Sequence, residues 1–258
     1  MLLAHSVALE SLEMSAMEQR SIEAYDLLQR VESYDADMEV MHPNRAKMVQ
    51  VALEILPFGR DSVLRALDLG IGTGYFTKKL LEHYPNCLVA AVDGAKAMID
   101  LAKERLRTSA GKVDFRLGDF RHLKQLVRGA AIFDVVYSSY ALHHLNRNDK
   151  QAVIGQSFEL LRPAGWFLNA DIIVAESPEI EQRLQELRIN GIVERAASRD
   201  IRFRDALSTR RFLHELEEGD ADQPQTLLED LRILKGAGFR PASVFWLEYR
   251  EALCGAQK

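Results

Sequence analysis

The chain has 258 residues, a length that fits one large domain or one core domain with an additional lobe. Hydrophobic residues make up 47% of the sequence and charged residues 28%, which excludes a wholly disordered chain. The 38 acidic and 33 basic residues give a formal net charge of −5, whereas a nucleic-acid-binding protein normally has a basic excess. We therefore expect no nucleic-acid partner.

The cysteines and the apolar runs indicate the compartment. Cys87 and Cys254 are too few for a disulfide framework or a four-cysteine zinc site, and such low usage is typical of a reducing compartment. The first residues lack the basic region of a signal peptide, and no run of 18 apolar residues predicts a membrane-spanning helix. We expect a cytoplasmic protein with no membrane partner.

The first 60 residues lack strand patterns. Residues 6–33 contain neither Gly nor Pro and are rich in Glu, Leu and Met, which predicts one or two helices. Residues 44–56 predict another helix, bounded by Pro43 and Pro57. We expect residues 1–60 to form a helical lid segment.

From residue 63 onward, short apolar runs alternate with helical patterns. This alternation predicts an α/β fold with a doubly wound, mostly parallel, Rossmann-like sheet. The helix before the fifth strand is expected to begin at Asn148 as its N-cap and to end in the turn 162–165. The expected strands are 63–69, 88–92, 113–117, 134–138 and 166–173, and the expected helices are 75–83, 95–106 and 148–161.

The alternation stops after the fifth strand. Residues 176–222 are helical in composition and rich in arginine, so we expect a helical cap inserted into the core. Residues 223–258 then complete the core that begins at 61–175. Within them we expect a helix at 226–237 and a closing pair of strands at 243–249 and 252–256.

A glycine-rich turn follows the first predicted strand. Gly70, Gly72 and Gly74 allow a tight turn and a close ligand approach, and Asp93 ends the next strand where an acidic residue can bind ribose hydroxyls. The third glycine comes one position earlier than in the dinucleotide pattern, and Asp68 would repel a phosphate. S-adenosylmethionine carries an ammonium and a sulfonium group and no phosphate, so the charges favour this cofactor.

With these motifs the sequence resembles the class I S-adenosylmethionine-dependent methyltransferases, in their small-molecule branch with methyltransferase domains 12 and 25. The resemblance covers residues 60–175 and, more weakly, the last 35. It rests on five motifs in chain order, at residues 66–74, 92–98, 117–120, 133–145 and 161–166.

The resemblance implies a seven-stranded sheet with an antiparallel last strand, S-adenosylmethionine as cofactor, S-adenosylhomocysteine as product, and no metal. The backbone of the glycine loop would lie close to the methionine portion, with Asp68 supporting the loop, and Asp93 would hold the ribose hydroxyls. Met98, Asp119 and Phe120 would surround the adenine, and Ser138 would lie beside the methionine. The implied cofactor-binding residues are Asp68, Gly70, Ile71, Gly72, Gly74, Asp93, Gly94, Met98, Asp119, Phe120 and Ser138.

Weaker signals concern catalysis. Ser138 to Ala141 stand where members that methylate amines or amides carry Asn or Asp, two prolines and an aromatic residue. Tyr140 and His143 are candidate catalytic residues, although His143 and His144 could equally pack a helix. Adjacent histidines point to different faces of a helix, so we expect no metal site. Methyl transfer chiefly requires an oriented nucleophile, so a protein base is not essential.

Candidate substrate-binding residues are Tyr34, Arg199 and Arg202. Tyr34 and Tyr25 could close over the cofactor or simply pack. The arginines could hold an acidic substrate group, or they could lie on a solvated helix face.

The expected function is in-line methyl transfer to a small-molecule acceptor. The alternatives are an enzyme like carboxy-S-adenosylmethionine synthase, favoured by the sequence from Tyr34 onward and at 133–145, or a non-catalytic cofactor-binding module. The expected partner is a small-molecule substrate, and the sequence is compatible with a homodimer.

Overall fold

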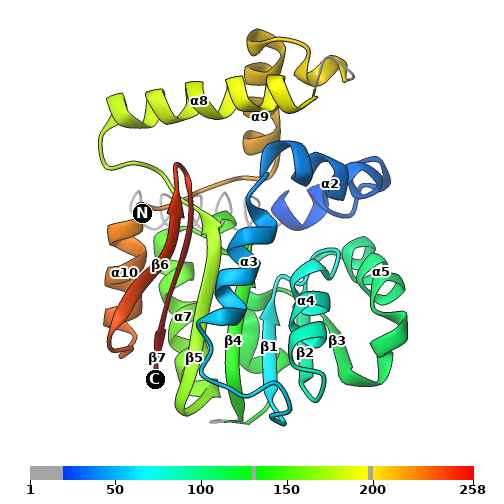
Figure 1. The fold of residues 1–258 in the computed structure, drawn as a ribbon, viewed down its shortest axis with the longest axis vertical. Helices are drawn as coiled ribbons and strands as arrows, with labels where there is room; N and C mark the ends of the chain where they lie inside the picture. The colour runs from blue at the N-terminus through cyan, green and yellow to red at the C-terminus, as the bar shows by residue number, and fades with distance from the viewer. Residues whose placement is uncertain (1–19, 130–131, 197–199) are drawn as a thin grey trace, which may run out of the picture.

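The computed structural model describes residues 20–129, 132–196 and 200–258 (Figure 1). Seven strands from these residues form one sheet, in the order β3-β2-β1-β4-β5-β7-β6. Strands β1 to β5 pair in parallel, and β7 lies antiparallel to both β5 and β6. The predicted Rossmann-like sheet with an antiparallel last strand is therefore confirmed.

The strands follow the apolar runs closely, because a parallel strand covered on both faces needs apolar side chains on both sides. The burial of β1 and β2 shows this, since every residue after the first of each strand is buried. The strands are β1 (Arg65–Leu69), β2 (Leu88–Asp93), β3 (Val113–Leu117), β4 (Phe133–Ser139), β5 (Leu161–Ile172), β6 (Ala242–Glu248) and β7 (Glu251–Gln257).

The helices alternate with the strands as predicted, and the glycine loop leads directly into α4. None of the helices in the described ranges is long and apolar enough to cross a lipid bilayer. The helices are α2 (Leu28–Met41), α3 (Arg45–Glu54), α4 (Tyr75–His83), α5 (Lys96–Arg105), α6 (Leu123–Leu126), α7 (Arg147–Leu160), α8 (Pro178–Ala196), α9 (Ala206–Gly219) and α10 (Leu227–Gly236).

Three predicted boundaries are wrong. Asn146, not Asn148, is the N-cap of α7, because its side-chain oxygen accepts a hydrogen bond from the Asp149 amide at 2.9 Å. Residues 162–165 belong to β5 instead of a turn, since Lys258 pairs with them through backbone hydrogen bonds. Helix α2 also continues to Met41, beyond the predicted end at residue 33. The predicted helix before residue 20 lies outside the described residues.

Two apolar clusters cover the two faces of the sheet. Side chains of β1 alternate between them: Ala66 belongs to one cluster and Leu67 to the other, as the period of a strand requires. Helices α3 and α4 pack on the first face, and α7 and α10 pack on the second. The sheet is therefore the middle layer of three.

The N-terminal segment and the cap meet at the carboxyl ends of the strands. Figure 1 shows α2, α8 and α9 gathered beyond that edge of the sheet. A third apolar cluster joins them, with Met41 of α2 packed among Ile192 of α8 and Leu213 of α9. Two ion pairs, Arg30–Asp220 and Arg202–Asp37, also join the N-terminal segment to the cap. These elements form one layer over the sheet edge.

A buried ion pair between α7 and α10 yields a stability prediction. Lys150 Nζ lies 3.0 Å from Asp230 Oδ1, and both side chains are almost completely buried. Replacing only Lys150 by Met leaves a buried unpaired carboxylate, which should cost about 3–5 kcal/mol of unfolding free energy. The double variant Lys150→Met, Asp230→Leu should recover most of that loss.

Urea denaturation measures both changes. The exposed pair Lys124–Glu159 on the same side of the protein is the control, and Lys124→Met should change stability by less than about 1 kcal/mol. Equal losses in Lys150→Met and Lys124→Met would contradict a structural role for the buried pair.

Candidate active site

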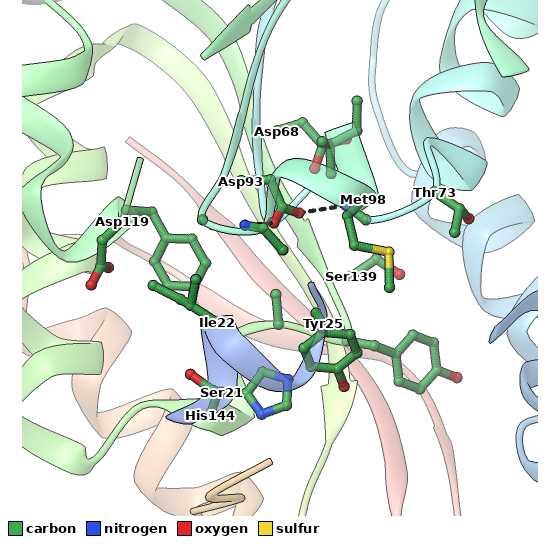
Figure 2. Close-up of a pocket in the computed structure, with 18 of the residues that line it drawn as sticks. Ser21, Ile22, Tyr25, Asp68, Thr73, Asp93, Met98, Asp119, Ser139 and His144 are labelled. Atoms are coloured by element: carbon green, nitrogen blue, oxygen red, sulfur yellow. Dashed lines mark hydrogen bonds between the residues drawn. The ribbon is translucent and has the colours of Figure 1, made fainter. Parts of the chain in front are cut away.

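A cavity of about 840 Å³, partly open to solvent, lies at the carboxyl ends of the first strands (Figure 2). Ligands of open α/β sheets bind at this edge. The N-terminal segment closes its other side. The lining residues are Ser21, Ile22, Tyr25, Tyr34, Arg45, Asp68, Gly70, Ile71, Gly72, Thr73, Phe76, Asp93, Gly94, Ala95, Met98, Asp119, Phe120, Arg121, Ser139, Tyr140, Ala141, His144 and Leu145.

The loop between β1 and α4 requires glycine at two positions. Gly70 has a φ of +77°, and a Cβ there would lie 2.5 Å from the Cβ of Ala141. Gly72 has a φ of +53°, but a Cβ there would meet no atom within 4 Å, because its α-carbon faces open space. The backbone of the loop can therefore approach a ligand closely.

Asp93 joins the glycine loop to the start of α5. Its Oδ2 accepts a hydrogen bond from Gly72 N at 2.8 Å, drawn in Figure 2, and its Oδ1 accepts one from Ala95 N at 2.9 Å. Burial raises the pKa of Asp93, and the two amide donors oppose this shift. Because an ionised carboxylate has about four acceptor sites, each oxygen can still accept a ligand hydroxyl.

Asp68 places a second carboxylate under the glycine loop. Its Oδ2 accepts a hydrogen bond from Thr77 Oγ1 at 2.5 Å, whereas its Oδ1 is buried without a hydrogen-bond partner among the described residues. Burial raises the pKa of Asp68 to about 7. A cationic group in the cavity would supply the missing partner and favour the ionised form.

The structure gathers most of the predicted cofactor residues around this cavity, with two exceptions. Ser138 is buried and donates its hydroxyl to the Leu69 carbonyl at 2.9 Å, so Ser139 lines the cavity instead. Gly74 caps the start of α4 and is not a lining residue. Asp119 lines the cavity on the far side from Thr73 (Figure 2), but its carboxylate already accepts from Arg121 N at 2.8 Å.

Sequence patterns missed much of the N-terminal wall. Ser21, Ile22 and Arg45 line the cavity, and no motif marks them. Asp35 of α2 fixes this wall to the core, because it accepts from Thr73 Oγ1 at 3.0 Å and forms an ion pair with Arg105 of α5. In the sequence, the only signal for this contact is an acidic residue within a predicted helix. Exposed helices commonly carry such residues, so the signal does not identify the contact.

A second cavity of about 540 Å³ adjoins the first, between the N-terminal segment and the cap. The two cavities share three aromatic side chains: Tyr25, Tyr34 and Tyr140. Two ligands bound in these cavities would therefore meet at the tyrosines. The second cavity is lined by Tyr25, Arg30, Tyr34, Asp37, Met38, Met41, His42, Tyr140, His143, Ile172, Arg188, Leu216, Glu217, Asp220 and Asp222.

Tyr140 has an uncommon backbone conformation at the junction of the cavities. Its φ is +51°, which costs a non-glycine residue roughly 1–2 kcal/mol. The buried ring lies 4.7 Å from the ring of His42, and burial raises the pKa of Tyr140 well above its usual range. Such strain is typical of residues held in place for function.

The predicted catalytic candidate His143 lines the second cavity. Its Nδ1 lies 2.5 Å from Asp171 Oδ1 at the end of β5. Burial alone would lower the pKa of His143, but the carboxylates of Asp171 and Asp222 outweigh burial and raise it. The carboxylates thus favour a positive charge at this position.

The expectation that His143 and His144 point to different faces of a helix is wrong. Leu142–His144 form a 3₁₀ turn instead of an α-helix, and the rings of His143 and His144 lie only 4.0 Å apart. Both imidazoles face Asp222, with His144 Nδ1 at 2.8 Å and His143 Nε2 at 3.5 Å from its Oδ1.

The structure places the candidate Arg202 away from both cavities. Arg202 pairs with Asp37 and Asp200 and lies against two phenylalanine rings, and it lines neither cavity. Its role here is to hold the cap on α2. Arg199 lies outside the described residues.

Comparison with known proteins agrees with this geometry. Residues 66–165 match a family described as "Methyltransferase domain". Residues 66–165 therefore carry a methyltransferase domain, and the resemblance to the class I S-adenosylmethionine-dependent methyltransferases is confirmed. An O-methyltransferase family protein from Burkholderia thailandensis has a similar fold, with a TM-score of 0.64 and 19% identity, covering 91% of this chain and 61% of that one.

Two curated relatives match different shares of the chain. An uncharacterized methyltransferase of Anoxybacillus flavithermus is 35% identical over 50% of this chain and 57% of its own length. A carboxy-S-adenosyl-L-methionine synthase of Campylobacter lari is 24% identical over 80% of this chain and 83% of its own length. The chain spans about half the length of several curated relatives that it matches, such as the first.

The first cavity fits S-adenosylmethionine, the cofactor of this family. The free Oδ1 of Asp68 suits its ammonium group, and the remaining acceptor sites of Asp93 suit its ribose hydroxyls. The open space at Gly72 leaves room for its methionine chain. This cofactor supplies an activated methyl group, while the protein supplies the position and the charges around it.

We predict that Asp93→Ala weakens binding of S-adenosylhomocysteine by about 1–3 kcal/mol, the usual cost of losing hydrogen bonds to a charged group. Isothermal titration calorimetry measures the change. Asp100→Ala is the matched control, because Asp100 is an exposed carboxylate on the neighbouring helix and does not line the cavity. Equal affinity of the two variants would contradict the ribose assignment.

We also predict that binding of S-adenosylhomocysteine strengthens as pH rises through about 7. The pKa of Asp68 is about 7 in the ligand-free fold, so the carboxyl is neutral below that pH and ionised above it. Only the ionised form attracts the ligand's ammonium, and affinity should fall by up to about tenfold per pH unit below 7. Calorimetry at about pH 6 and about pH 8 tests this.

The Asp68→Asn variant isolates this titration from that of other groups. Its affinity should be weaker above pH 7, and its dependence on pH should be flatter. A pH dependence that is the same in Asp68→Asn and in the parent chain would assign the titration to a different group.

Proposed function

We propose that the chain transfers the methyl group of S-adenosylmethionine to a small-molecule acceptor bound in the second cavity. The observation that carries this proposal is the shared wall of Tyr25, Tyr34 and Tyr140 between the two cavities. A cofactor in the first cavity and an acceptor in the second would meet at this wall. Aromatic faces attract cations, so the tyrosines suit a sulfonium.

The layer over the sheet edge supports a lid role for residues 1–60 and 176–222. Elements of both segments line the second cavity, including Met38 of α2 and Leu216 of α9. The ion pair Arg30–Asp220 ties the two segments together beside it. A lid of this kind would exclude water and hold the acceptor for in-line attack, and orientation supplies much of the rate enhancement.

The side chains of the second cavity suit a polar acceptor. Tyr140 and His143 face this cavity; we assign His143 to the surroundings of the acceptor and Tyr140 to the boundary between acceptor and cofactor. Of the arginines that line the cavity, Arg30 pairs with Asp220 and Arg188 with Glu217. Because both guanidinium groups already have acidic partners, neither favours an acidic group on the acceptor.

A second candidate rests on the long match to the Campylobacter synthase. That relative matches 80% of the chain, including segments outside the core. A function like that of a carboxy-S-adenosylmethionine synthase would modify the cofactor itself and leave its methyl group in place. The two candidates therefore differ in the fate of the methyl group.

Incubation with S-adenosylmethionine carrying a deuterated methyl group separates the candidates. The acceptor panel should include phenols, catechols, amines and 2-oxo acids, with products read by mass spectrometry. We expect S-adenosylhomocysteine together with one acceptor carrying the labelled methyl group. Asp93→Ala should lower kcat/KM by at least about tenfold, whereas Asp100→Ala should not.

Other outcomes decide against methyl transfer. A cofactor derivative that retains the label would favour the second candidate. Binding of the cofactor without turnover across the panel, in a chain whose own co-purifying ligand is also unmethylated, would favour a non-catalytic module.

A further inference from the structure

Three metal-binding side chains converge at the wall between the two cavities. The candidate donor atoms of His143, His144 and Asp222 all lie within 4.8 Å of one another. Asp222 Oδ1 is 2.8 Å from His144 Nδ1 and 3.5 Å from His143 Nε2. Ligands bonded to one metal at about 2.1 Å lie roughly 3 Å apart, so the spacing is close to that of a metal site.

Two of these atoms lack the hydrogen bonds that burial demands. His144 Nδ1 and Asp222 Oδ1 are buried, yet neither has a hydrogen-bond partner among the described residues. The two atoms lie 2.8 Å apart, at the distance of an ion pair. Since buried polar atoms are almost always paired, a cation that both atoms bind would account for them.

Asp171 orients the third ligand. Its Oδ1 lies 2.5 Å from His143 Nδ1 and also accepts from the Ile172 amide at 2.9 Å. A proton on His143 Nδ1 leaves the lone pair of Nε2 directed toward Asp222. Metal-binding histidines commonly have such a carboxylate partner on their second nitrogen.

Hydrogen bonds to the backbone hold Asp222 beside the turn that carries the two histidines. Gln223 N donates to the His143 carbonyl at 2.7 Å, and Gln225 Nε2 donates to the Leu145 carbonyl at 3.1 Å. Asp222 is therefore fixed beside the histidines although it follows them by almost 80 residues.

Among the described residues, no arginine or lysine forms an ion pair with the carboxylates beside the two histidines. Asp171 and Asp222 form ion pairs only with the histidines among the described residues. The neighbouring basic side chains already have acidic partners: Arg30 pairs with Asp220, Arg188 with Glu217, and Lys150 with Asp230.

From these observations we propose that His143, His144 and Asp222 bind one divalent transition-metal ion, such as Zn²⁺ or Fe²⁺. Two imidazoles and one carboxylate suit these ions and leave coordination positions open. His144 lines the first cavity, and His143 and Asp222 line the second. Figure 2 places His144 beside Tyr25, on the opposite side of the first cavity from Asp68.

This position indicates a class of acceptor, an inference that rests on the proposed function. A metal at the wall would bind an acceptor oxygen next to the cofactor's methyl group. Acceptors with two adjacent oxygens, such as catechols or 2-oxo acids, could occupy two open positions at once. The metal would thereby orient the nucleophile and favour its deprotonated form.

Metal binding can be tested without an acceptor. The untagged full chain is stripped with a chelator and titrated with Zn²⁺ in a calorimeter, and Co²⁺ serves as a spectroscopic probe. We expect one Zn²⁺ per chain and visible Co²⁺ bands typical of nitrogen and oxygen ligands. Asp222→Asn and His144→Ala should each weaken Zn²⁺ binding by at least about tenfold.

Two further variants refine the test. Asp171→Asn should weaken Zn²⁺ by about 10–100-fold and retain the one-to-one stoichiometry, as expected of a residue that only orients a ligand. His214→Ala removes an exposed histidine that faces Glu218 on α9 and should change nothing. If Asp222→Asn fails to fold, His144→Ala and His144→Gln carry the test.

The absence of one-to-one Zn²⁺ binding by the parent chain would overturn the proposal. So would equal affinity of His214→Ala and both ligand variants. Asp222 does not line the first cavity. The Asp222→Asn variant should therefore bind S-adenosylhomocysteine as the parent chain does, and this binding is measured in parallel. Methyl transfer by a chelator-treated chain that binds no Zn²⁺ would disprove the metal site and leave the proposed function intact.

Discussion

The carboxylate of Asp93 is the interaction on which the cofactor cavity depends. It accepts hydrogen bonds from Gly72 N and Ala95 N and thus holds together the loops that follow β1 and β2. Parallel strands bring those loops to one edge of the sheet, and the shared acceptor adds to the backbone hydrogen bonds that Gly70 N and Ile71 N donate to the Val92 carbonyl. The same side chain retains acceptor sites for a ligand. In the proposed ribose assignment, one buried group would combine a structural role with a binding role, which would account for an acidic side chain at a buried position.

The layer over that edge converts an open groove into two connected cavities. Met41, Ile192 and Leu213 supply the apolar contact between α2 and the cap, and Arg202 bridges the same elements through Asp37. Because this interface is small and polar at its margin, it can open more easily than the core. An acceptor site built on it would be accessible to substrate and closed during the reaction. In the proposed function, the buried sheet below would hold the cofactor residues in place while this layer opens and closes.

The core could be predicted from the sequence because its signals are local. The strands β1 and β2 are apolar runs, and the glycines at 70 and 72 are required by local backbone angles. Most residues that line the second cavity could not be predicted, because they come from five segments that are far apart in the sequence. Asp222 has no motif around it, and its place beside His143 depends on long-range backbone pairing through Gln223. For Arg202 the sequence indicated a substrate-binding role that the structure does not support. Its guanidinium forms an ion pair with Asp37 of α2 instead.

A crystal structure with bound S-adenosylhomocysteine tests the central claim most directly. The account predicts that the ribose contacts Asp93, that the ammonium contacts Asp68, and that the sulfur faces the wall of Tyr25 and Tyr140. In that position the vacant methyl side would open toward the second cavity. A ligand bound elsewhere, or a sulfur atom turned away from the tyrosines, would contradict the arrangement of donor and acceptor.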